Sequence, residues 1–388
     1  MSTPYAPPAG YGDISFVELV PLALRFLGLG LKLVFLALSY PFSSTKFSLK
    51  RVLWRQFVRA ICPPSSIRQL QFVCPATGVL YQKYMRSLPN KPPVISENIG
   101  DGISLHWMGP KTNKKVMYYL HGGGFVLPAV DGHFYMLDWW RNEAKKRHGI
   151  DFSIAVLEYS TYLIDCTSSC QLSKARMIGL INFAPWPTQL VQVAAGLAHL
   201  LKEGYDPANI TVVGDSVGGH EVIFLLAHLI HGHPAADVLN LEKPLAGAAA
   251  LSPWLCFGTE TTSWKQHGHS DVMPLGALNK WSGWFIKSRT RTDDSYYFEP
   301  ALAPAEWWGG LEKVAKNVLM AGGASEGMFD DIVTTEKAME KGAGKQVKLE
   351  IFGQEGANHN EALVEFACGD APGSTNYRML EWLKEVYA

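Results

Sequence analysis

Charged side chains are scarce in this sequence, and neither sign is in excess. Only 18% of the 388 residues are Asp, Glu, Lys or Arg, and 35 cationic residues stand against 35 anionic ones. Nucleic-acid binding as the main function is therefore excluded, because no surplus of cations can neutralise phosphates. Cysteine is also scarce, and six residues are too few for a disulfide-stapled chain of this length. Cys166 and Cys170 are close enough in sequence to pair, but free thiols are the simpler interpretation.

Apolar side chains are abundant by contrast, at 47% of the residues. Such a composition excludes an intrinsically disordered chain, and the length permits one large α/β domain or two smaller ones. Two His-Gly-His triplets, at 231–233 and 267–269, raise the question of a metal site. No acidic or cysteine ligand stands at a supporting spacing in the sequence, so we expect no metal there.

The most apolar stretch covers residues 14–42 and is long enough to span a bilayer, which takes about 20 apolar residues. It contains Glu18, Arg25 and Lys32, spaced seven apart, so all three charges project from one face of a helix. This pattern suits a helix that lies in the membrane interface with its apolar side down. Hydropathy alone leaves a spanning helix open, and a helix packed on the protein's own body is the alternative. We predict that residues 1–45 bind a membrane surface, with the endoplasmic reticulum as one candidate location.

Past residue 100 the chain alternates short apolar runs with longer amphipathic ones. Several short runs are almost continuously apolar, as in central strands covered on both faces. Strand–helix alternation of this kind predicts an α/β fold with a mostly parallel central sheet and helices on both faces. The predicted strands are Ile103–Met108, Lys115–Leu120, Ser153–Tyr159, Asn209–Val213, Leu245–Leu251, Asn317–Met320 and Gln346–Phe352. The clearest predicted helices are Pro187–Glu203, His220–Ile230, Asp331–Lys341 and Thr375–Tyr387.

A nucleophile motif follows one of these strands. The sequence after Val213 is GDSVGG, which places Ser216 in a G-x-S-x-G pattern between a strand and an apolar helix. A sharp turn there brings the backbone close to itself, so side chains at Gly214 and Gly218 would collide. The same turn exposes the Ser216 hydroxyl above the sheet, and the helix N-terminus adds positive partial charge beside it. We predict that Ser216 is a catalytic nucleophile.

A second motif supplies hydrogen-bond donors. The strand that ends at Leu120 runs directly into HGGGF, and consecutive glycines leave peptide N–H groups unshielded. Acyl transfer needs two or three such donors at the developing oxyanion, and one donor typically contributes ~3 kcal/mol. We predict Gly122, Gly123 and Val217 as the oxyanion hole, with His121 anchoring the loop. A phosphate-cradling loop fits poorly, because no Lys-Ser/Thr follows the glycines.

HGGGF at 121–125, followed by GDSVGG and by Leu251-Ser-Pro-Trp254, resembles the hormone-sensitive-lipase-like branch of the α/β-hydrolase fold. The resemblance covers residues 100–388 and implies an esterase, lipase or deacetylase without a cofactor. The apolar N-terminal segment and Trp307-Trp308 are most similar to fungal members, including membrane-bound steryl-acetate deacetylases. Val217 stands where relatives often have alanine, and this departure weakens any transfer of substrate from them.

The fold presents its catalytic triad in the order nucleophile, acid, histidine. His359 lies in a polar loop after the last predicted strand, where an imidazole can reach over the nucleophile, so we predict it as the general base. The resemblance places the acid at Glu326, with Asp330 as the alternative four positions on. Asp330 and Asp331 directly precede an apolar-periodic run and suit a helix cap, which favours Glu326 as the residue that orients the histidine.

An aromatic-rich insertion at about 256–310 is expected to form a helical cap together with residues 46–100. The remainder of 101–388 then forms the catalytic domain. A cap of this kind excludes water and favours a lipophilic substrate, although its aromatics also serve to hold it to the body. These aromatic residues are Trp264, Trp281, Trp284, Phe285, Tyr296, Tyr297, Phe298, Trp307 and Trp308.

The motifs and the resemblance together predict a membrane-associated serine carboxylic-ester hydrolase. The expected substrate carries a short acyl group, acetyl in the first instance, on a lipophilic alcohol such as a sterol or terpenoid. Two alternatives stay open at this stage. One is an acyltransferase, lactonase or cyclase of secondary metabolism that uses the same site, and the other is a hydrolase-fold receptor or scaffold without chemistry.

Overall fold

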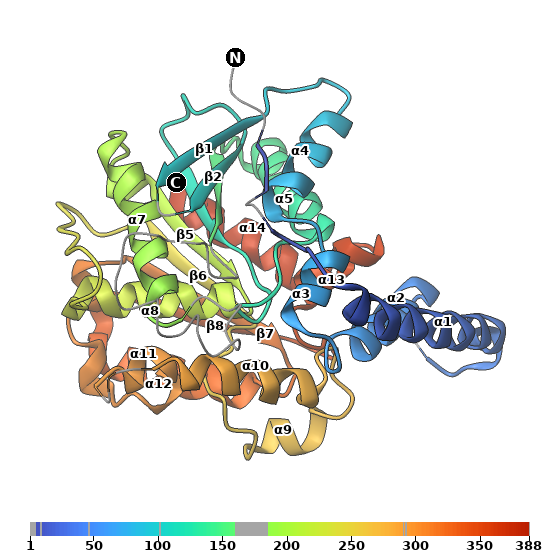
Figure 1. Cartoon of the computed structure of the whole chain (residues 1–388). Coiled ribbons are helices and arrows are strands. Elements are labelled where there is room, and N and C mark those ends of the chain that lie inside the picture. Colours follow the sequence, from blue (N-terminus) through green and yellow to red (C-terminus); the bar gives the residue numbers. More distant parts are fainter. Residues whose placement is uncertain are drawn as a thin grey trace.

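An eight-stranded sheet forms the centre of the molecule in the computed structural model (Figure 1). The structure describes residues 5–7, 10–45, 47–100, 102–159, 185–289, 291 and 293–387, so Cys166 and Cys170 lie outside the described residues. The strand order is β1-β2-β4-β3-β5-β6-β7-β8. The strands are β1 Ile95–Gly100, β2 Ile103–Met108, β3 Val116–Leu120, β4 Ser153–Glu158, β5 Ile210–Asp215, β6 Gly247–Leu251, β7 Asn317–Gly323 and β8 Lys348–Gln354. The pairs from β4 onward are parallel, whereas β1–β2 and β2–β4 are antiparallel.

Helices cover both faces of the sheet. The longer helices of the body are α4 Thr77–Ser87, α5 Asp131–His148, α7 Thr188–Lys202, α8 Val217–His231, α12 Phe329–Ala343, α13 Glu361–Cys368 and α14 Ser374–Tyr387. The helices at the molecule's edge are α1 Phe16–Ser39, α2 Leu49–Ile61, α3 Ile67–Val73, α9 Thr262–His267, α10 Leu275–Lys287 and α11 Ser295–Phe298. Short 3-10 turns are η1 Tyr40–Phe42, η2 Pro207–Asn209, η3 Pro300–Leu302, η4 Ala305–Trp308, η5 Leu311–Lys313 and η6 Gly344–Gln346.

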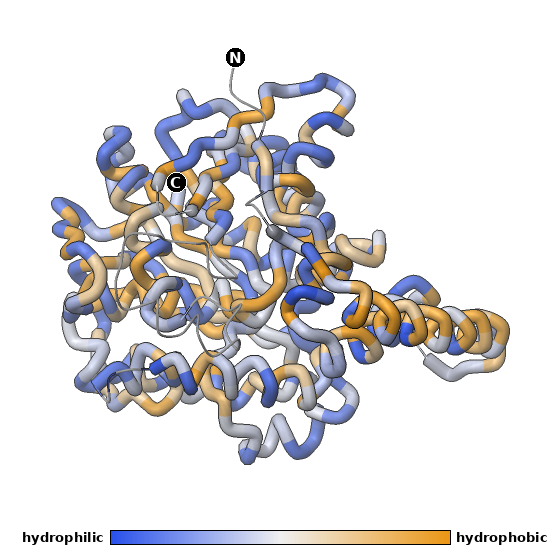
Figure 2. Tube along the Cα trace, viewed as in Figure 1, coloured by the Kyte–Doolittle hydropathy of each residue, from blue (hydrophilic) through white to orange (hydrophobic). Residues whose placement is uncertain are grey.

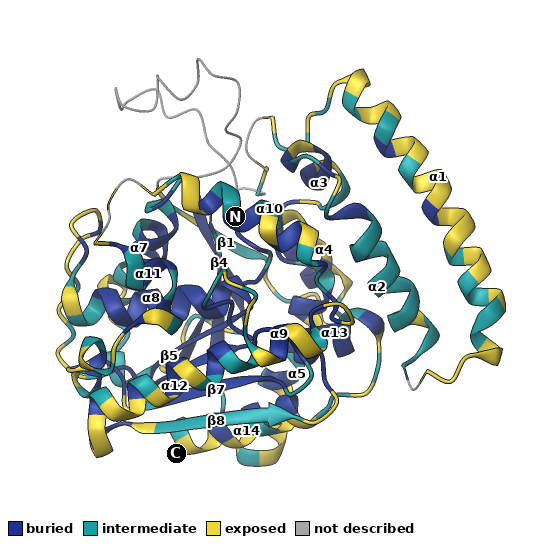
Figure 3. Cartoon of the chain, turned by 90° about the horizontal axis from the view of Figure 1, so that it is seen from below, coloured by how far each residue is buried: buried dark blue, intermediate teal, exposed yellow. Residues whose placement is uncertain are grey.

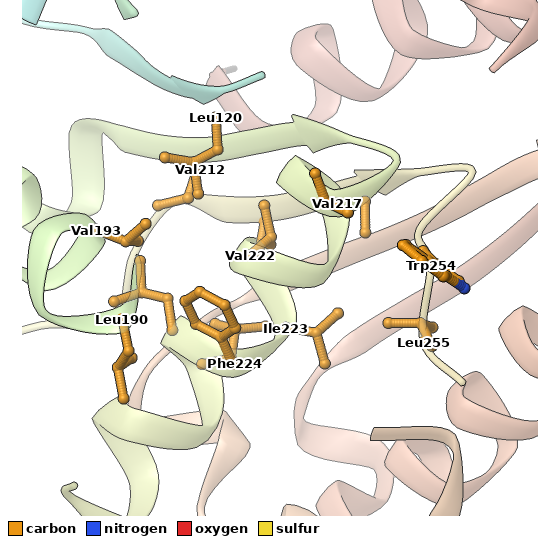
Figure 4. Packing of buried hydrophobic residues seen from close by; sticks show 14 of the residues in the cluster. Leu120, Leu190, Val193, Val212, Val217, Val222, Ile223, Phe224, Trp254 and Leu255 are labelled. Carbon is orange, nitrogen blue, oxygen red and sulfur yellow. The ribbon is translucent and has the colours of Figure 1, made fainter. Parts of the chain in front are cut away.

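Alternate side chains of the central strands enter two separate cores. On β3, Tyr118 and Leu120 join the core that α7, α8 and α12 cover, whereas Met117 and Tyr119 join the core under α5 and α14. This period of two is what a strand buried on both faces requires. Figure 4 shows the first core from close by, where side chains of α7 and α8 pack against Leu120 and Val212. Strand β5, which ends directly before Ser216, is thereby held between two packed layers.

The α/β architecture expected from the sequence is confirmed, and one strand was missed. Strand β1 reads ISENIG, whose polar residues hide the alternation, and it lies at the sheet edge where one side is exposed. The predicted domain boundary between residues 100 and 101 is therefore wrong, because it falls inside the β1–β2 hairpin. Helix α4 also packs on the body core through Leu80, Tyr81 and Tyr84, so the segment 46–100 is only partly a cap.

Helices α1 and α2 form the outermost layer of the molecule. Figure 3 shows α2 between α1 and the remainder of the protein, and Figure 2 shows that α1 is mostly hydrophobic along its length. Only Leu22 and Leu29 of α1 are buried, whereas side chains such as Val17, Leu31 and Phe35 are at least 70% exposed. The apolar face of α1 is therefore turned outward.

Candidate active site

The turn between β5 and α8 presents Ser216 at the carboxyl edge of the sheet. Ser216 has φ 53° and ψ −119°, a left-handed backbone that L residues rarely adopt outside strained functional turns. A side chain at Gly214 would collide with the Gly218 carbonyl, and one at Gly218 would collide with the Leu120 carbonyl. The steric reason for both glycines is thus confirmed, and the turn raises the serine hydroxyl above the strand ends.

Three side chains from distant loops meet at this turn. His359 Nε2 lies 3.0 Å from Ser216 Oγ, and His359 Nδ1 lies 3.2 Å from Glu326 Oε2. All three residues are almost fully buried, with exposed fractions of 9% for Ser216, 3% for His359 and 0% for Glu326. The carboxylate only accepts hydrogen bonds, so Nδ1 carries the proton and Nε2 of the neutral ring accepts from the serine hydroxyl. This is the arrangement that a nucleophile, its base and an orienting acid require.

The electrostatics of His359 suit proton transfer. Burial alone would lower its pKa, but the hydrogen bond and negative charge of Glu326 raise the pKa of His359, with Asp271 and Asp215 adding to the effect. The imidazolium that forms when the serine is deprotonated is therefore stabilised by nearby carboxylates. His359 and Glu326 together can therefore hold the serine proton during the reaction.

Asp330, the alternative acid, is placed elsewhere. Its Oδ2 accepts from the Ser263 backbone N–H at 2.9 Å, and the Ser263 hydroxyl oxygen accepts from the Asp330 N–H at 3.2 Å. The capping argument was wrong in detail, because α12 begins at Phe329 after the N-cap Met328, so Asp330 lies inside the first turn. Glu326 alone of the two candidates contacts the histidine, as the free position in the loop predicted.

Asp271, in the cap insertion, joins the two loops that carry the acid and the base. Its Oδ1 accepts from the His359 backbone N–H at 2.8 Å, and its Oδ2 accepts from the Gly327 N–H at 3.0 Å. The residue is 2% exposed. Sequence reasoning missed Asp271 because it stands in a polar stretch, His-Gly-His-Ser-Asp, without a local pattern.

The oxyanion loop departs from its predicted assignment at one residue. The Gly122 N–H donates to Asp215 Oδ1 at 2.9 Å, so this amide is occupied and the prediction of Gly122 as an oxyanion donor is wrong. The amides of Gly123, Gly124 and Val217 donate to no other described residue. Gly123 and Gly124 line the cavity at Ser216, and Val217 is the first residue of α8, directly after the serine. Gly123 and Val217 remain predicted donors, and Gly124 takes the place of Gly122.

Asp215 is the second residue that sequence reasoning missed. Its buried carboxylate accepts from the Tyr119 hydroxyl at 2.6 Å, the Asn360 side-chain amide at 2.6 Å and the Gly122 amide. The His133 ring nitrogen Nε2 lies 3.2 Å away. Burial alone would raise the pKa of Asp215, but these partners, His133 first, hold it well below its usual range. The Asp215 carboxylate therefore contacts both the oxyanion loop and the histidine loop from the nucleophile turn. Its position inside GDSVGG was the one feature of the sequence that could have indicated this role.

A cavity of about 150 Å³ opens at the triad. Its walls are mostly apolar and come from the cap helices α2, α3 and α10, with Trp54, Phe57, Ile61 and Leu278 among them. Of the nine aromatic residues in the insertion, Trp281 alone lines this cavity in the described part of the chain, and its ring packs against Gly124. Most of the others pack into the body. The ring of Phe285, for example, stacks on that of Phe125 with 4.3 Å between the ring centroids.

Both histidines of the first His-Gly-His triplet are engaged by other groups. His231 contacts the Trp307 carbonyl oxygen at 2.7 Å, and His233 pairs with Asp294 at 3.1 Å. Among the residues that the structure describes, no three His, Cys, Asp or Glu side chains gather closely enough to hold a metal ion.

Glu221, one turn into α8, is a buried carboxyl group without a hydrogen-bond partner among the described residues. Neither carboxylate oxygen accepts a hydrogen bond from any described residue, and the side chain is fully inaccessible. Burial first, and then the charge of Asp215, raise the pKa of Glu221 well above its ordinary value. The folded state therefore keeps the Glu221 proton at a pH where the unfolded chain has lost it. The free energy of unfolding consequently falls as pH rises.

Glu221→Gln is expected to raise the free energy of unfolding, and by more at pH 8 than at pH 6. Glutamine does not titrate, so the difference from the parent grows by up to about 1.4 kcal/mol per pH unit. Urea unfolding at the two pH values measures this, with Glu260→Gln as the control because that side chain is 90% exposed. Equal pH dependence in the parent and Glu221→Gln would contradict the assignment.

Comparison with known proteins agrees with this fold. Residues 183–361 match the family described as alpha/beta hydrolase fold. An esterase/lipase from an uncultured bacterium is 19% identical with a TM-score of 0.59, covering 88% of this chain and 99% of that one. An esterase of the bacterial hormone-sensitive lipase family is 18% identical with a TM-score of 0.61, covering 89% and 100% respectively. No match is found among curated proteins.

At this level of identity the solved structures establish a shared fold, and the chain has the α/β-hydrolase fold. The family match spans the nucleophile turn and the histidine loop, and the structure places the serine, imidazole and carboxylate of those segments in contact. Fold, family match and site together indicate a serine hydrolase.

Proposed function

We propose that the protein hydrolyses carboxylic esters through Ser216, His359 and Glu326. The observation that carries this proposal is the unbroken chain of contacts from the serine hydroxyl through the imidazole to the carboxylate, at the floor of an apolar cavity. A receptor or scaffold has no need of this proton path.

The reaction follows from the geometry. Ser216 Oγ attacks the ester carbonyl carbon while its proton passes to His359 Nε2, and the amides of Gly123, Gly124 and Val217 stabilise the oxyanion. When the tetrahedral intermediate collapses, His359 returns the proton to the leaving alcohol and an acyl-enzyme remains. Water then attacks the acyl carbonyl by the same route and releases the carboxylic acid.

We propose a short acyl group, acetyl in the first instance, on a lipophilic alcohol such as a sterol or terpenoid. The small cavity and the Trp281 ring against Gly124 support a short acyl group. The apolar walls from α2, α3 and α10 support an alcohol without charge near the reacting carbonyl. The resemblance to fungal steryl-acetate deacetylases points in the same direction.

A panel of acetylated lipophilic alcohols tests this proposal, with the products identified by mass spectrometry. Release of free alcohol and acetate is the expected result, and longer acyl esters of the same alcohols should react more slowly. Transfer of the acyl group to a second alcohol, lactonisation or cyclisation would instead show that the same triad serves another reaction. Unchanged substrates throughout would contradict the proposed substrate class.

We further propose that α1 attaches the protein to a membrane surface. The segment Phe16–Phe42 is long and apolar enough to cross a bilayer by length and composition, and only 11% of its most apolar window is buried. An interfacial position is supported by contacts of the residues that precede α1. The Tyr5 hydroxyl donates to Glu158 and the Tyr11 hydroxyl donates to the Cys74 carbonyl, so residues before α1 lie on the same body as α2. A spanning α1 would separate these residues by about 30 Å of hydrocarbon.

The orientation of α1 also supports the interfacial mode. Arg25 donates to Gln69 on α3 at 3.2 Å, so this charge faces the protein while the apolar residues face outward. The sequence predicted charges on one face, and at Arg25 that face is covered by α3.

Leu27→Glu with Leu31→Glu is expected to abolish flotation of the full chain with phosphatidylcholine vesicles in a density gradient. The two side chains are 65% and 70% exposed, and burying each contributes about 1.5–3 kcal/mol. The matched control is Val238→Glu with Leu302→Glu, which are 71% and 59% exposed on the body. Equal flotation of both double variants would contradict attachment through α1.

A further inference from the structure

A second cavity, of about 260 Å³, lies between the C-terminal end of α1, the first turns of α2 and the start of α13. Tyr40 and Phe47 line it from the loop between the helices, and Arg51, Arg55 and Glu361 bring charge to its wall. It contains none of the triad residues. Val272 and Val364 line both cavities, so these two side chains separate the second cavity from the catalytic one.

Arg55 has no hydrogen-bond partner among the described residues, unlike Arg51 and Arg59 on the same helix. Arg51 is paired with Glu361 and Asp370, and Arg59 donates to the backbone carbonyls of Asp271 and His269. Arg55 makes no hydrogen bond or ion pair with any other described residue, and its Nε is buried without a partner. The cavity wall therefore carries one cation more than it has anions.

Asp271 is the carboxylate whose charge acts on Arg55, but it makes no hydrogen bond or ion pair with the guanidinium. The Asp271 carboxylate is already engaged by the backbone amides of His359, Gly327 and Val272. Burial and the charge of Arg59 lower the pKa of Arg55, and Asp271 opposes this only in part. A partly buried guanidinium without a partner costs free energy that an entering anion would recover.

The position of the cavity identifies what kind of anion fits. Leu36 and Ser39 of α1 line it, whereas Phe35 and Leu38 on the same turns are each 70% exposed on the apolar face of the helix. A ligand seated on Arg55 therefore has apolar surface of α1 directly beside it. Only a molecule with both an anionic end and an apolar tail uses both features.

We propose that this cavity binds the anionic head group of a membrane lipid, with Arg55 as its counterion and the tail along the apolar face of α1. The head group accepts hydrogen bonds from the guanidinium, and Tyr40 and Phe47 enclose it. A bound lipid fills the space between α1, α2 and α13, and so holds the outer helices against the body. The site is independent of ester hydrolysis, because no triad residue takes part.

Binding of dihexanoyl phosphatidic acid to the full chain in a neutral detergent tests the proposal by isothermal titration, with Ser216→Ala as the background of every measurement so that the ester bonds of the ligand are not hydrolysed. Saturable binding at one site is expected, and Arg55→Gln should weaken it at least about tenfold, as for loss of a charged hydrogen bond. Arg68→Gln is the matched control, since Arg68 is exposed on the neighbouring helix α3 and its loss changes the net charge equally. It should leave the affinity within about twofold of the parent.

Two further ligands separate a lipid site from other possibilities without any variant. Dihexanoyl phosphatidylcholine should bind at least about tenfold more weakly, because its head group has no net charge. Inorganic phosphate should also bind at least about tenfold more weakly, because it has no tail to bury. Equal affinity for phosphatidylcholine, equal affinity for inorganic phosphate, or unchanged binding in a folded Arg55→Gln would each overturn the proposal.

Discussion

Ser216→Ala is expected to reduce kcat for p-nitrophenyl acetate by roughly 10⁶, the scale at which a triad nucleophile contributes in other serine hydrolases. The methyl group of alanine cannot attack a carbonyl, and the remaining oxyanion donors only bind the substrate. Steady-state hydrolysis of the ester measures the loss. The side chain is small and 9% exposed, so the substitution should leave the fold intact.

Ser270→Ala is the control for this experiment. Ser270 is exposed in the cap insertion and its hydroxyl donates to the His267 carbonyl, so its removal should leave turnover within about twofold of the parent. Turnover by Ser216→Ala comparable to that of the control would leave the protein without its proposed nucleophile.

Glu326→Gln is the second substitution with a large expected effect, a decrease of kcat by about 10⁴. The amide keeps the shape of the side chain but removes the charge that orients His359 and stabilises its protonated form. The pKa of His359 should fall with that charge. Because the base must be neutral to accept the serine proton, the acid limb of the kcat/KM profile should move to lower pH.

Asp330→Asn is the matched control for the triad acid. Asp330 contacts Ser263 rather than the histidine, so its kcat should change by less than about threefold and its pH profile should keep its acid limb. A reversal of the two results, with Asp330→Asn inactive and Glu326→Gln active, would assign the acid to Asp330.

Sequence reasoning reached the parts of the site that local patterns encode. Ser216 has its turn glycines on both sides, and His359 follows the last strand, so each could be placed from its own segment of the chain. The central strands were predicted for the same reason, since buried parallel strands read as continuous apolar runs. The mixed strand β1 at the sheet edge has no such run, and it was missed.

The parts that sequence reasoning did not reach depend on partners far away in the chain. Asp271 binds amides 56 and 88 residues further on, and nothing in its own segment predicts either contact. The wrong prediction of Gly122 as an oxyanion donor has the same origin. Its amide donates to the Asp215 carboxylate, 93 residues away in the sequence, and is therefore not free for an oxyanion. Three glycines in a row predict free donors, but the competing carboxylate that takes the first one becomes visible only in three dimensions.

Labelling of the full chain with a fluorophosphonate probe, followed by peptide mass spectrometry, tests the central claim most directly. A single phosphonate adduct on Ser216 is expected, formed quickly in the parent and lost in His359→Ala, because the probe reacts only with a serine whose proton the imidazole can accept. A parent protein that gains no adduct at Ser216, or gains it equally fast without the histidine, would contradict the account.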